Sequence, residues 1–217
     1  MDEIALMAEI LVVHHEDPQP RLIRRAADII RAGGLAAFPT DSAYALGGHL
    51  GDAGLLDRIR RIRGVDERHH FTLMCRDLSE IATYAKVDNA QYRLLKANTP
   101  GSYTFILEGS KELPRRVLHP RRKTIGLRIP DHPVALALLA ELDEPLLSST
   151  LLLPDEEDPP SSAQAIDERI GRQLDLIIDG GAADEHRAAA TTVVNLAGGA
   201  AEIVRVGRGS LTPFGFE

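Results

Sequence analysis

The chain has 217 residues, and 44% of them are hydrophobic, which is enough for one domain with a substantial core. Its formal net charge is −7, and its single cysteine, Cys75, excludes an internal disulfide or a cysteine-cluster metal site. Apolar stretches such as 134–142 are far shorter than the roughly 20 residues that cross a bilayer, and the N-terminus lacks the basic start of a secretory signal. We therefore expect a cytoplasmic protein without membrane contact, organised as one domain over residues 1–217.

The apolar pattern predicts strands and helices in alternation along the chain, which is typical of an α/β fold. Helices are expected to begin near residues 20, 52, 77, 88, 131 and 161, with Asp52 and Ser161 as N-caps of the second and the last. An acidic loop is expected at 155–158 and a mobile loop at 184–190. Strands are expected over 10–13, 35–38, 71–75, 103–107, 124–129, 145–147, 174–178, 191–196 and 202–206.

The stretch 35–48 ends an apolar strand at Pro39 and presents polar side chains directly after it. Residues 40–42 lie where open α/β sheets collect ligands, and the glycine pair 47–48 allows the backbone to turn or to approach a neighbour closely. Two interpretations remain open. The segment forms the floor of a binding site, or it is a turn whose polar side chains bond only to local backbone.

Basic residues are concentrated in the middle of this acidic chain. The segment 58–128 holds 16 Lys and Arg against 7 Asp and Glu. Such a local field indicates an anionic ligand, unless the charges are paired with acidic parts of the chain after folding. The basic loop 111–123, which prolines interrupt, contributes Arg115, Arg116, Arg121, Arg122 and Lys123 to this basic surface.

No phosphate loop, dinucleotide fingerprint, nucleophile elbow or paired-histidine zinc helix is present, and no metal site is predicted. What remains is a dispersed set of hydroxyls at strand ends together with Arg61, Arg63, Arg128 and Arg205. Guanidinium groups and hydroxyls hold phosphates and carboxylates in fixed geometry. Arg128 in particular lies on a predicted strand and needs an anionic partner, either a structural carboxylate or a ligand. The residues alone therefore predict a small-molecule or nucleotide anion site.

Four segments in this order resemble the Sua5/YrdC/YciO/YwlC family: Phe38–Gly47, Pro100–Leu107, Thr124–Pro130 and Thr191–Asn195. The resemblance extends over about residues 21–207. It implies a single α/β domain with a twisted, open mixed sheet, flanking helices and a concave basic cavity. The best-known members make threonylcarbamoyl-AMP from threonine, bicarbonate and ATP with Mg²⁺, for the modification of a tRNA adenosine. Members of the family have also been described as binding double-stranded RNA through a basic concave surface. The resemblance therefore implies RNA contacts from the basic loop, at Arg115, Arg116, Arg121, Arg122 and Lys123.

The resemblance also implies roles for individual residues. Ser42 would meet threonine, Arg128 would bind its carboxylate, and Arg205 would lie at the phosphates. The full set expected around substrate and nucleotide is Ser42, Thr124, Arg128, Ser148, Thr150, Thr191 and Arg205.

The catalytic signature of the synthases is altered in this sequence. Their Lys-x-Arg motif reads Arg61-Ile62-Arg63 here, and their Ser-x-Asn motif reads Thr150-Leu151-Leu152. Met74 stands where some synthases carry a histidine, and the segment 71–77 resembles the YciO branch.

Two classes of function follow from the resemblance. In the first, the chain binds a nucleotide and double-stranded RNA or tRNA, with an altered catalytic signature and a link to tRNA modification or translation. In the second, it is an enzyme that uses ATP and Mg²⁺, either an active threonylcarbamoyl-AMP synthase or a hydrolase of the adenylate. Arg61 and Arg63 would then be catalytic, stabilising charge that develops during the reaction.

Overall fold

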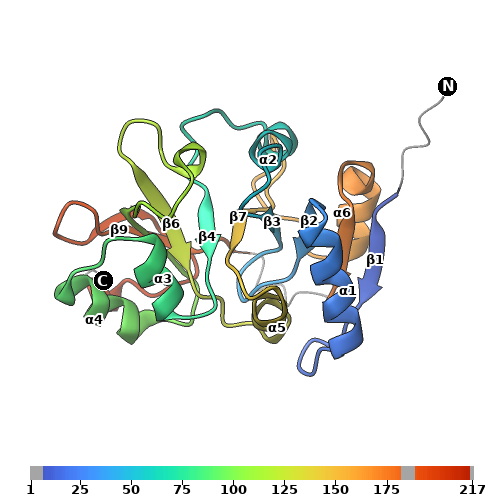
Figure 1. Ribbon diagram of the computed structural model, residues 1–217, viewed down its shortest axis with the longest axis horizontal. Helices are drawn as coiled ribbons and strands as arrows, with labels where there is room; N and C mark the ends of the chain where they lie inside the picture. The colour runs from blue at the N-terminus through green and yellow to red at the C-terminus, as the bar shows by residue number, and fades with distance from the viewer. Residues whose placement is uncertain (1–6, 182–188, 216–217) are drawn as a thin grey trace.

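The computed structural model describes residues 7–181 and 189–215. A mixed sheet runs through it in the order β1-β8-β2-β3-β7-β4-β6-β5-β9-β10 (Figure 1). The sheet combines parallel pairs, such as β4 with β6, and antiparallel pairs, such as β3 with β7. The predicted α/β class with an open mixed sheet is confirmed. The strands are β1 (Glu9–Val12), β2 (Ala36–Phe38), β3 (Ala45–His49), β4 (Thr72–Met74), β5 (Tyr103–Glu108), β6 (Thr124–Arg128), β7 (Leu146–Thr150), β8 (Leu176–Asp179), β9 (Thr192–Asn195) and β10 (Glu202–Arg205).

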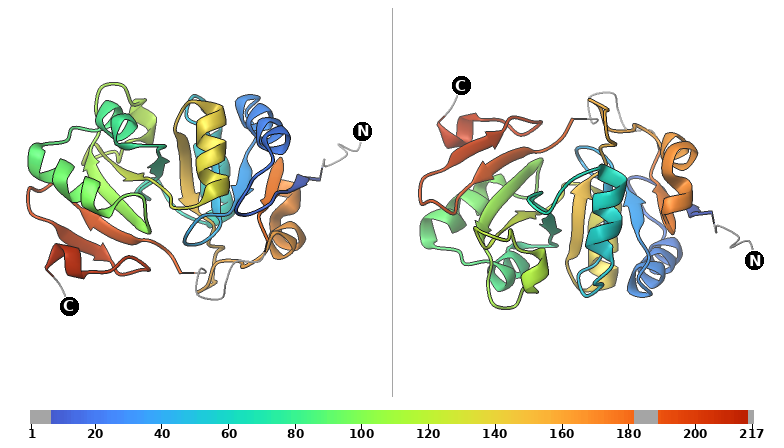
Figure 2. Two further views of the ribbon diagram at one scale, coloured as in Figure 1. Left: turned by 90° about the horizontal axis from the view of Figure 1, so that it is seen from below. Right: turned by 90° about the horizontal axis from the view of Figure 1, so that it is seen from above.

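Helices flank the sheet on both faces. Figure 2 shows α2 and α5 on opposite sides of the central strands. On one side, Ile23 and Ile30 of α1 join Val134 and Leu138 of α5 in a buried apolar cluster. On the other, α2 and α6 contribute buried side chains to a second cluster. The helices are α1 (Pro20–Arg31), α2 (Leu55–Arg63), α3 (Leu78–Tyr84), α4 (Asn89–Asn98), α5 (Pro133–Leu142) and α6 (Ala163–Ile170), and a short 3₁₀ turn, Arg115–Val117, lies in the basic loop.

Two predicted helix caps are shifted. Ser162, not Ser161, caps α6, because its hydroxyl accepts the Ala165 N–H. The second helix begins later than expected, and Asp52 instead accepts the N–H of Gly54 in the preceding turn. Both errors arise because neighbouring residues could serve equally well as caps in the sequence.

The strand β3 was not predicted, because its two glycines favour a turn. In the structure, β3 pairs antiparallel with both β2 and β7, so Gly47 and Gly48 lie inside the sheet. A Cβ atom on Gly47 would lie 3.0 Å from Phe38 and 3.1 Å from the Leu147 carbonyl oxygen. The glycines thus serve the close approach that was one of the two expectations for them.

The strand expected over 145–147 continues to Thr150, so Ser148 and Ser149 lie within β7 rather than after it. Most of the loop expected over 184–190 lies outside the described residues. Within the described ranges, no helix has the length and apolar character needed to span a bilayer.

The substitution Gly47→Val tests the packing around β3. Its side chain would overlap Phe38 and the β7 backbone, and such overpacking costs about 1–3 kcal/mol. We expect a corresponding loss in the free energy of unfolding, measured by urea denaturation. Gly198→Ala is the control, because a Cβ atom at Gly198 meets nothing within 4 Å. Unchanged stability of Gly47→Val would contradict the packing described.

Candidate functional site

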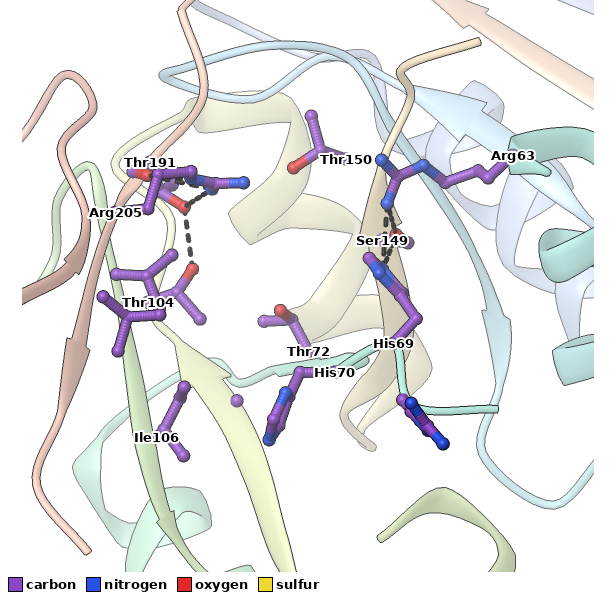
Figure 3. A pocket seen from close by; sticks show the side chains of 14 residues that line it. Arg63, His69, His70, Thr72, Thr104, Ile106, Ser149, Thr150, Thr191 and Arg205 are labelled. Atoms are coloured by element: carbon purple, nitrogen blue, oxygen red, sulfur yellow. Dashed lines mark hydrogen bonds between the residues drawn. The ribbon is translucent and has the colours of Figure 1, made fainter. Parts of the chain in front are cut away.

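A cavity of about 440 Å³ lies over the strands β4, β5, β6 and β9 (Figure 3). Thr72, Gly126 and Ile106 form one row across its floor, because they are paired neighbours on β4, β6 and β5. A Cβ atom on Gly126 would come within 3.1 Å of Thr104, Phe71 and Thr72. Glycine at this position therefore avoids steric overlap at the floor of the cavity. The residues that line the cavity are Arg63, Arg68, His69, His70, Thr72, Thr104, Ile106, Gly126, Ser149, Thr150, Thr191, Val193, Val204 and Arg205.

Arg63, the last residue of α2, points into this cavity from one side (Figure 3). Its guanidinium donates hydrogen bonds to the Ser149 hydroxyl at 2.7 Å and to the Leu152 carbonyl at 3.2 Å, and its Nη1 lies 2.9 Å from His69 Nε2. Burial and the charge of Arg205 lower the pKa of Arg63 to about 10. The group therefore remains charged at neutral pH while having lost most of its water.

Arg205 of β10 approaches the same cavity from the opposite side (Figure 3). It donates to the Thr191 carbonyl at 2.9 and 3.2 Å and to the Thr191 hydroxyl at 3.2 Å. That hydroxyl is 2.9 Å from the hydroxyl of Thr104. Burial and the charge of Arg128 lower the pKa of Arg205. The Thr191 segment thus holds this guanidinium in place, and no carboxylate among the described residues forms an ion pair with it.

The electrostatic balance of the cavity is one-sided. The described lining residues include arginines and histidines but no carboxylate. Neither Arg63 nor Arg205 forms an ion pair with any residue in the described ranges. Two desolvated cations that face one cavity favour an anion between them. The same lining does not fit a Mg²⁺ site by itself, because Mg²⁺ requires oxygen ligands that usually include carboxylates.

A smaller hollow of about 20 Å³ shares five lining residues with the cavity and reaches Ser148 and Arg128. Arg128 is buried, and its Nη2 donates to Asp41 at 2.5 Å. Asp41 also accepts the Ser102 hydroxyl at 2.7 Å and the Asp131 N–H at 3.0 Å. Burial opposes ionisation of Asp41, but Arg128 and these hydrogen bonds outweigh it and hold the pKa of Asp41 below its usual value.

This pair settles one question that the sequence left open. The anionic partner of Arg128 is a structural carboxylate, Asp41, and this aspartate bonds well beyond its local turn. The Nε atom of Arg128 is buried and has no hydrogen-bond partner among the described residues. Arg128 therefore keeps one donor available at the hollow.

The structure brings most of the predicted site residues together. Arg63, Thr150, Thr191 and Arg205 line the cavity. Ser148 and Arg128 line the deeper hollow. Two predicted residues lie behind the lining. Ser42 is buried and bonds to Thr40, while Thr124 is buried with its hydroxyl 3.3 Å from His70 Nε2.

Arg61 is the predicted catalytic residue that the structure does not bring to the cavity. Its side chain is exposed on α2, and it is absent from the described lining residues. The reason is helical geometry, because residues two positions apart differ by about 200° around the axis. Arg63 faces inward, and Arg61 therefore faces solvent.

Two of the five predicted RNA-contacting residues line a separate groove of about 870 Å³. Arg121 and Arg122 line this groove, and their N–H groups donate to His119 Nδ1, which orders the turn. Arg115 and Lys123 are exposed nearby in sequence, whereas Arg116 donates to the carbonyls of residues 50 and 51. The groove also includes Asp66 and Glu67, and it shares Arg68 with the cavity.

Sequence reasoning missed His69 and His70 as cavity residues, whereas Ser149 belongs to the strand-end hydroxyls, 148–150, that were expected at the anion site. The histidines precede β4 in a loop, where no periodicity indicates the direction of a side chain. Burial, Arg63, His70, Arg205 and Arg60 lower the pKa of His69 to about 4. Burial, His119 and Arg122 lower the pKa of His70. The only available signal was the position of both histidines beside a strand already expected to reach the site.

Fold and site together define an α/β protein with an open mixed sheet and a basic cavity. The sequence model of the Sua5/YciO/YrdC family, described as Telomere recombination, matches residues 28–207, and the chain belongs to this family. The chain is 49% identical to the protein YciO of Escherichia coli K12 over 208 residues, which cover 96% of this chain and 100% of YciO. The crystal structure of E. coli YciO superimposes with a TM-score of 0.92 over the same shares of the two chains.

More distant relatives carry a named activity. A threonylcarbamoyl-AMP synthase of Halorhodospira halophila is 29% identical over 163 residues, which cover 75% of this chain and 84% of the synthase. The structure of Pyrococcus abyssi Sua5 complexed with L-threonine matches with a TM-score of 0.84 and 27% identity, over 92% of this chain and 58% of Sua5. The predicted family is thus confirmed, with both YciO and Sua5 proteins among the relatives.

Replacing Asp41 with asparagine tests the buried ion pair. Loss of the carboxylate would leave Arg128 without a counter-charge, which costs about 3–5 kcal/mol for buried pairs. We expect a loss of this size in the free energy of unfolding. Glu9→Gln is the matched control, because the Glu9–Arg25 pair is exposed, and we expect little change from it.

The same variant gives a pH test. Because the pKa of Asp41 is lowered in the folded protein, its contribution is complete above the unfolded value of about 4 and is lost as pH falls through the lower folded value. Asp41→Asn should therefore flatten the acid end of the stability curve. If the stability of Asp41→Asn fell with decreasing pH as steeply as that of the unmodified chain, the result would contradict the Asp41–Arg128 ion pair.

Proposed function

We propose that the chain binds an adenylate-type nucleotide, ATP or AMP, in the basic cavity. The observation that carries this proposal is the placement of Arg63 and Arg205 on opposite sides of one cavity whose described lining holds no carboxylate. Phosphate oxygens accept hydrogen bonds from such guanidinium forks in fixed geometry. The hydroxyls of Thr150 and Thr191 on the same lining add neutral donors. The threonylcarbamoyl-AMP synthases among the relatives support an adenylate in particular.

The deeper hollow would hold the second part of such a ligand. Arg128 and Ser148 line a space contiguous with the cavity, and the Nε of Arg128 has no hydrogen-bond partner among the described residues. A carboxylate, such as that of threonine, could accept from Arg128 Nε, whereas the Ser148 hydroxyl already donates to the Thr72 carbonyl at 3.0 Å. The complex of P. abyssi Sua5 with L-threonine supports an amino acid as the occupant. Ser42 and Thr124 would act from behind the lining, by fixing Thr40 and His70.

The altered signature favours binding, or a changed reaction such as hydrolysis of the adenylate, over full synthesis. The position of the signature lysine is Arg61, which is exposed, and that of the signature asparagine is Leu152, which offers Arg63 only a backbone carbonyl. Threonylcarbamoyl-AMP synthesis from threonine, bicarbonate and ATP remains the alternative. If ATP is used, the Mg²⁺ would be held chiefly by its phosphates, since the lining supplies no carboxylate.

Calorimetric titration with AMP and ATP tests the cavity. We expect Arg63→Ala and Arg205→Ala each to weaken binding at least tenfold, because a hydrogen bond to a charged group contributes about 1.5–3 kcal/mol. Arg21→Ala, an exposed residue of α1, is the control and should bind as the unmodified chain does. Equal affinities for all four proteins would contradict the proposal.

The same proteins, given ATP, Mg²⁺, threonine and bicarbonate, decide between the alternatives. Pyrophosphate release with threonylcarbamoyl-AMP formation, abolished by Arg128→Ala, would establish a synthase. Nucleotide binding without turnover would support the altered function. The turnover of Arg61→Ala, measured in the same assay, shows whether the exposed Arg61 contributes to catalysis.

A second function, binding of double-stranded RNA or tRNA, is favoured by the groove beside the cavity. Arg68, Arg121 and Arg122 line it, and none of them forms an ion pair within the described ranges. RNA duplexes are recognised largely through phosphate and sugar contacts, for which such arginines are suited. The proposal links the chain to tRNA modification or translation.

Titration of a duplex RNA at several salt concentrations tests this binding. We expect affinity to fall steeply with salt, and the double variant Arg121→Ala, Arg122→Ala to reduce the slope by about 2. Arg21→Ala with Arg24→Ala removes the same charge from α1 and serves as the matched control. Salt-independent affinity, or equal slopes for the two double variants, would reject the groove as the RNA site.

A further inference from the structure

Three side chains meet in a closed triangle on one wall of the cavity (Figure 3). Arg63 Nη1 lies 2.7 Å from Ser149 Oγ and 2.9 Å from His69 Nε2. The third side joins His69 Nε2 to Ser149 Oγ at 3.1 Å. The triangle connects α2, the loop before β4, and β7. Its members other than Arg63 belong to no part of the synthase signature.

The chemistry of the donors fixes the state of His69. A guanidinium carries only N–H donors, so a nitrogen 2.9 Å from Arg63 Nη1 must accept. His69 therefore presents the lone pair of Nε2 to the triangle and carries its single proton on Nδ1. An imidazolium would place a second N–H against the guanidinium and break this contact.

We infer that neutral His69, together with Ser149, is a positioning residue that holds the Arg63 guanidinium in the orientation used to bind the anionic ligand of the cavity. This role rests on the proposed nucleotide site and adds to it the residue that sets its geometry. Arg63 needs such support because Arg205 repels it across the cavity. Without His69, only the Leu152 carbonyl and the Ser149 hydroxyl would accept hydrogen bonds from the Arg63 guanidinium and orient it.

The charged surroundings of His69 support the neutral state. Arg63 and Arg60 face it from α2, His70 follows it in the chain, and Arg205 faces it from β10, and all four disfavour a positive charge on the ring. With a pKa of about 4, His69 remains neutral from pH 8 down to pH 5.5. A histidine that bound phosphate directly would behave differently, because protonation on the approach to pH 6 would strengthen binding.

The experiment compares His69→Ala with His69→Gln in AMP titrations from pH 8 to pH 5.5. Glutamine can place an acceptor oxygen near the position of Nε2, whereas alanine cannot. We expect His69→Ala to weaken AMP binding about tenfold, which corresponds to the lower end, about 1.5 kcal/mol, of the contribution of one hydrogen bond to a charged group. We expect His69→Gln to restore affinity to within about twofold. His15→Gln, an exposed histidine outside the site, is the control.

The pH dependence separates the two roles. We expect the ratio of affinities between the unmodified chain and His69→Gln to remain constant over this range. A ratio that rises as pH falls would show an imidazolium that binds the phosphate, and would overturn the inference. Equal affinity of His69→Ala and the unmodified chain would overturn it as well. If AMP does not bind even the unmodified chain, the nucleotide proposal fails, and the state of His69 is then tested directly.

Long-range proton–nitrogen NMR of the histidine rings provides this direct test, and it does not require a ligand. We expect the proton of His69 on Nδ1 at pH 7, with Nε2 unprotonated. Loss of this pattern in Arg63→Ala would confirm that Arg63 selects the tautomer. A proton on Nε2 in the unmodified chain would overturn the inference.

Discussion

The buried ion pair between Asp41 and Arg128 is the interaction on which the site depends. Asp41 follows β2, Arg128 ends β6, and Ser102 and Asp131, which also donate to Asp41, flank β5 and α5. One carboxylate therefore connects the two halves of the sheet beneath the cavity. Burying such an ion pair costs free energy, and removing either partner would cost more. The pair therefore holds the segments that carry its two members in one arrangement. The Nε of Arg128 has no hydrogen-bond partner among the described residues, so it could donate to a ligand.

The cavity concentrates positive charge, and none of its described lining residues carries a negative charge that would neutralise it. Arg63 and Arg205 are held by neutral acceptors, namely carbonyls, hydroxyls and an uncharged imidazole. Neutral acceptors orient a guanidinium without cancelling its charge, which is the arrangement that an anion site requires. The same logic requires a neutral His69, with Nε2 as an acceptor and its one proton on Nδ1. The cavity is thus organised for an anion before any ligand arrives, and such preorganisation reduces the free-energy cost of binding.

Much of this could be predicted from the sequence, and the exceptions have physical causes. The segments around Phe38 and Thr124 carry strong local patterns, and their strands and the family were predicted correctly. The strand β3 was missed because Gly47 and Gly48 are read as turn residues, while their role, close contact with β2 and β7, exists only in the assembled sheet. Arg61 and Arg63 were grouped because both stand at the Lys-x-Arg motif of the synthases, although helical periodicity points them in different directions. His69 could not be assigned, because a loop has no period from which to infer its direction.

A crystal structure of the chain with AMP would test the central claim most directly. The account predicts the phosphate between Arg63 and Arg205, with both guanidinium groups within hydrogen-bond distance of its oxygens and the Arg63–His69 contact retained. A phosphate bound elsewhere, with the two arginines in their present positions and no ligand between them, would contradict it.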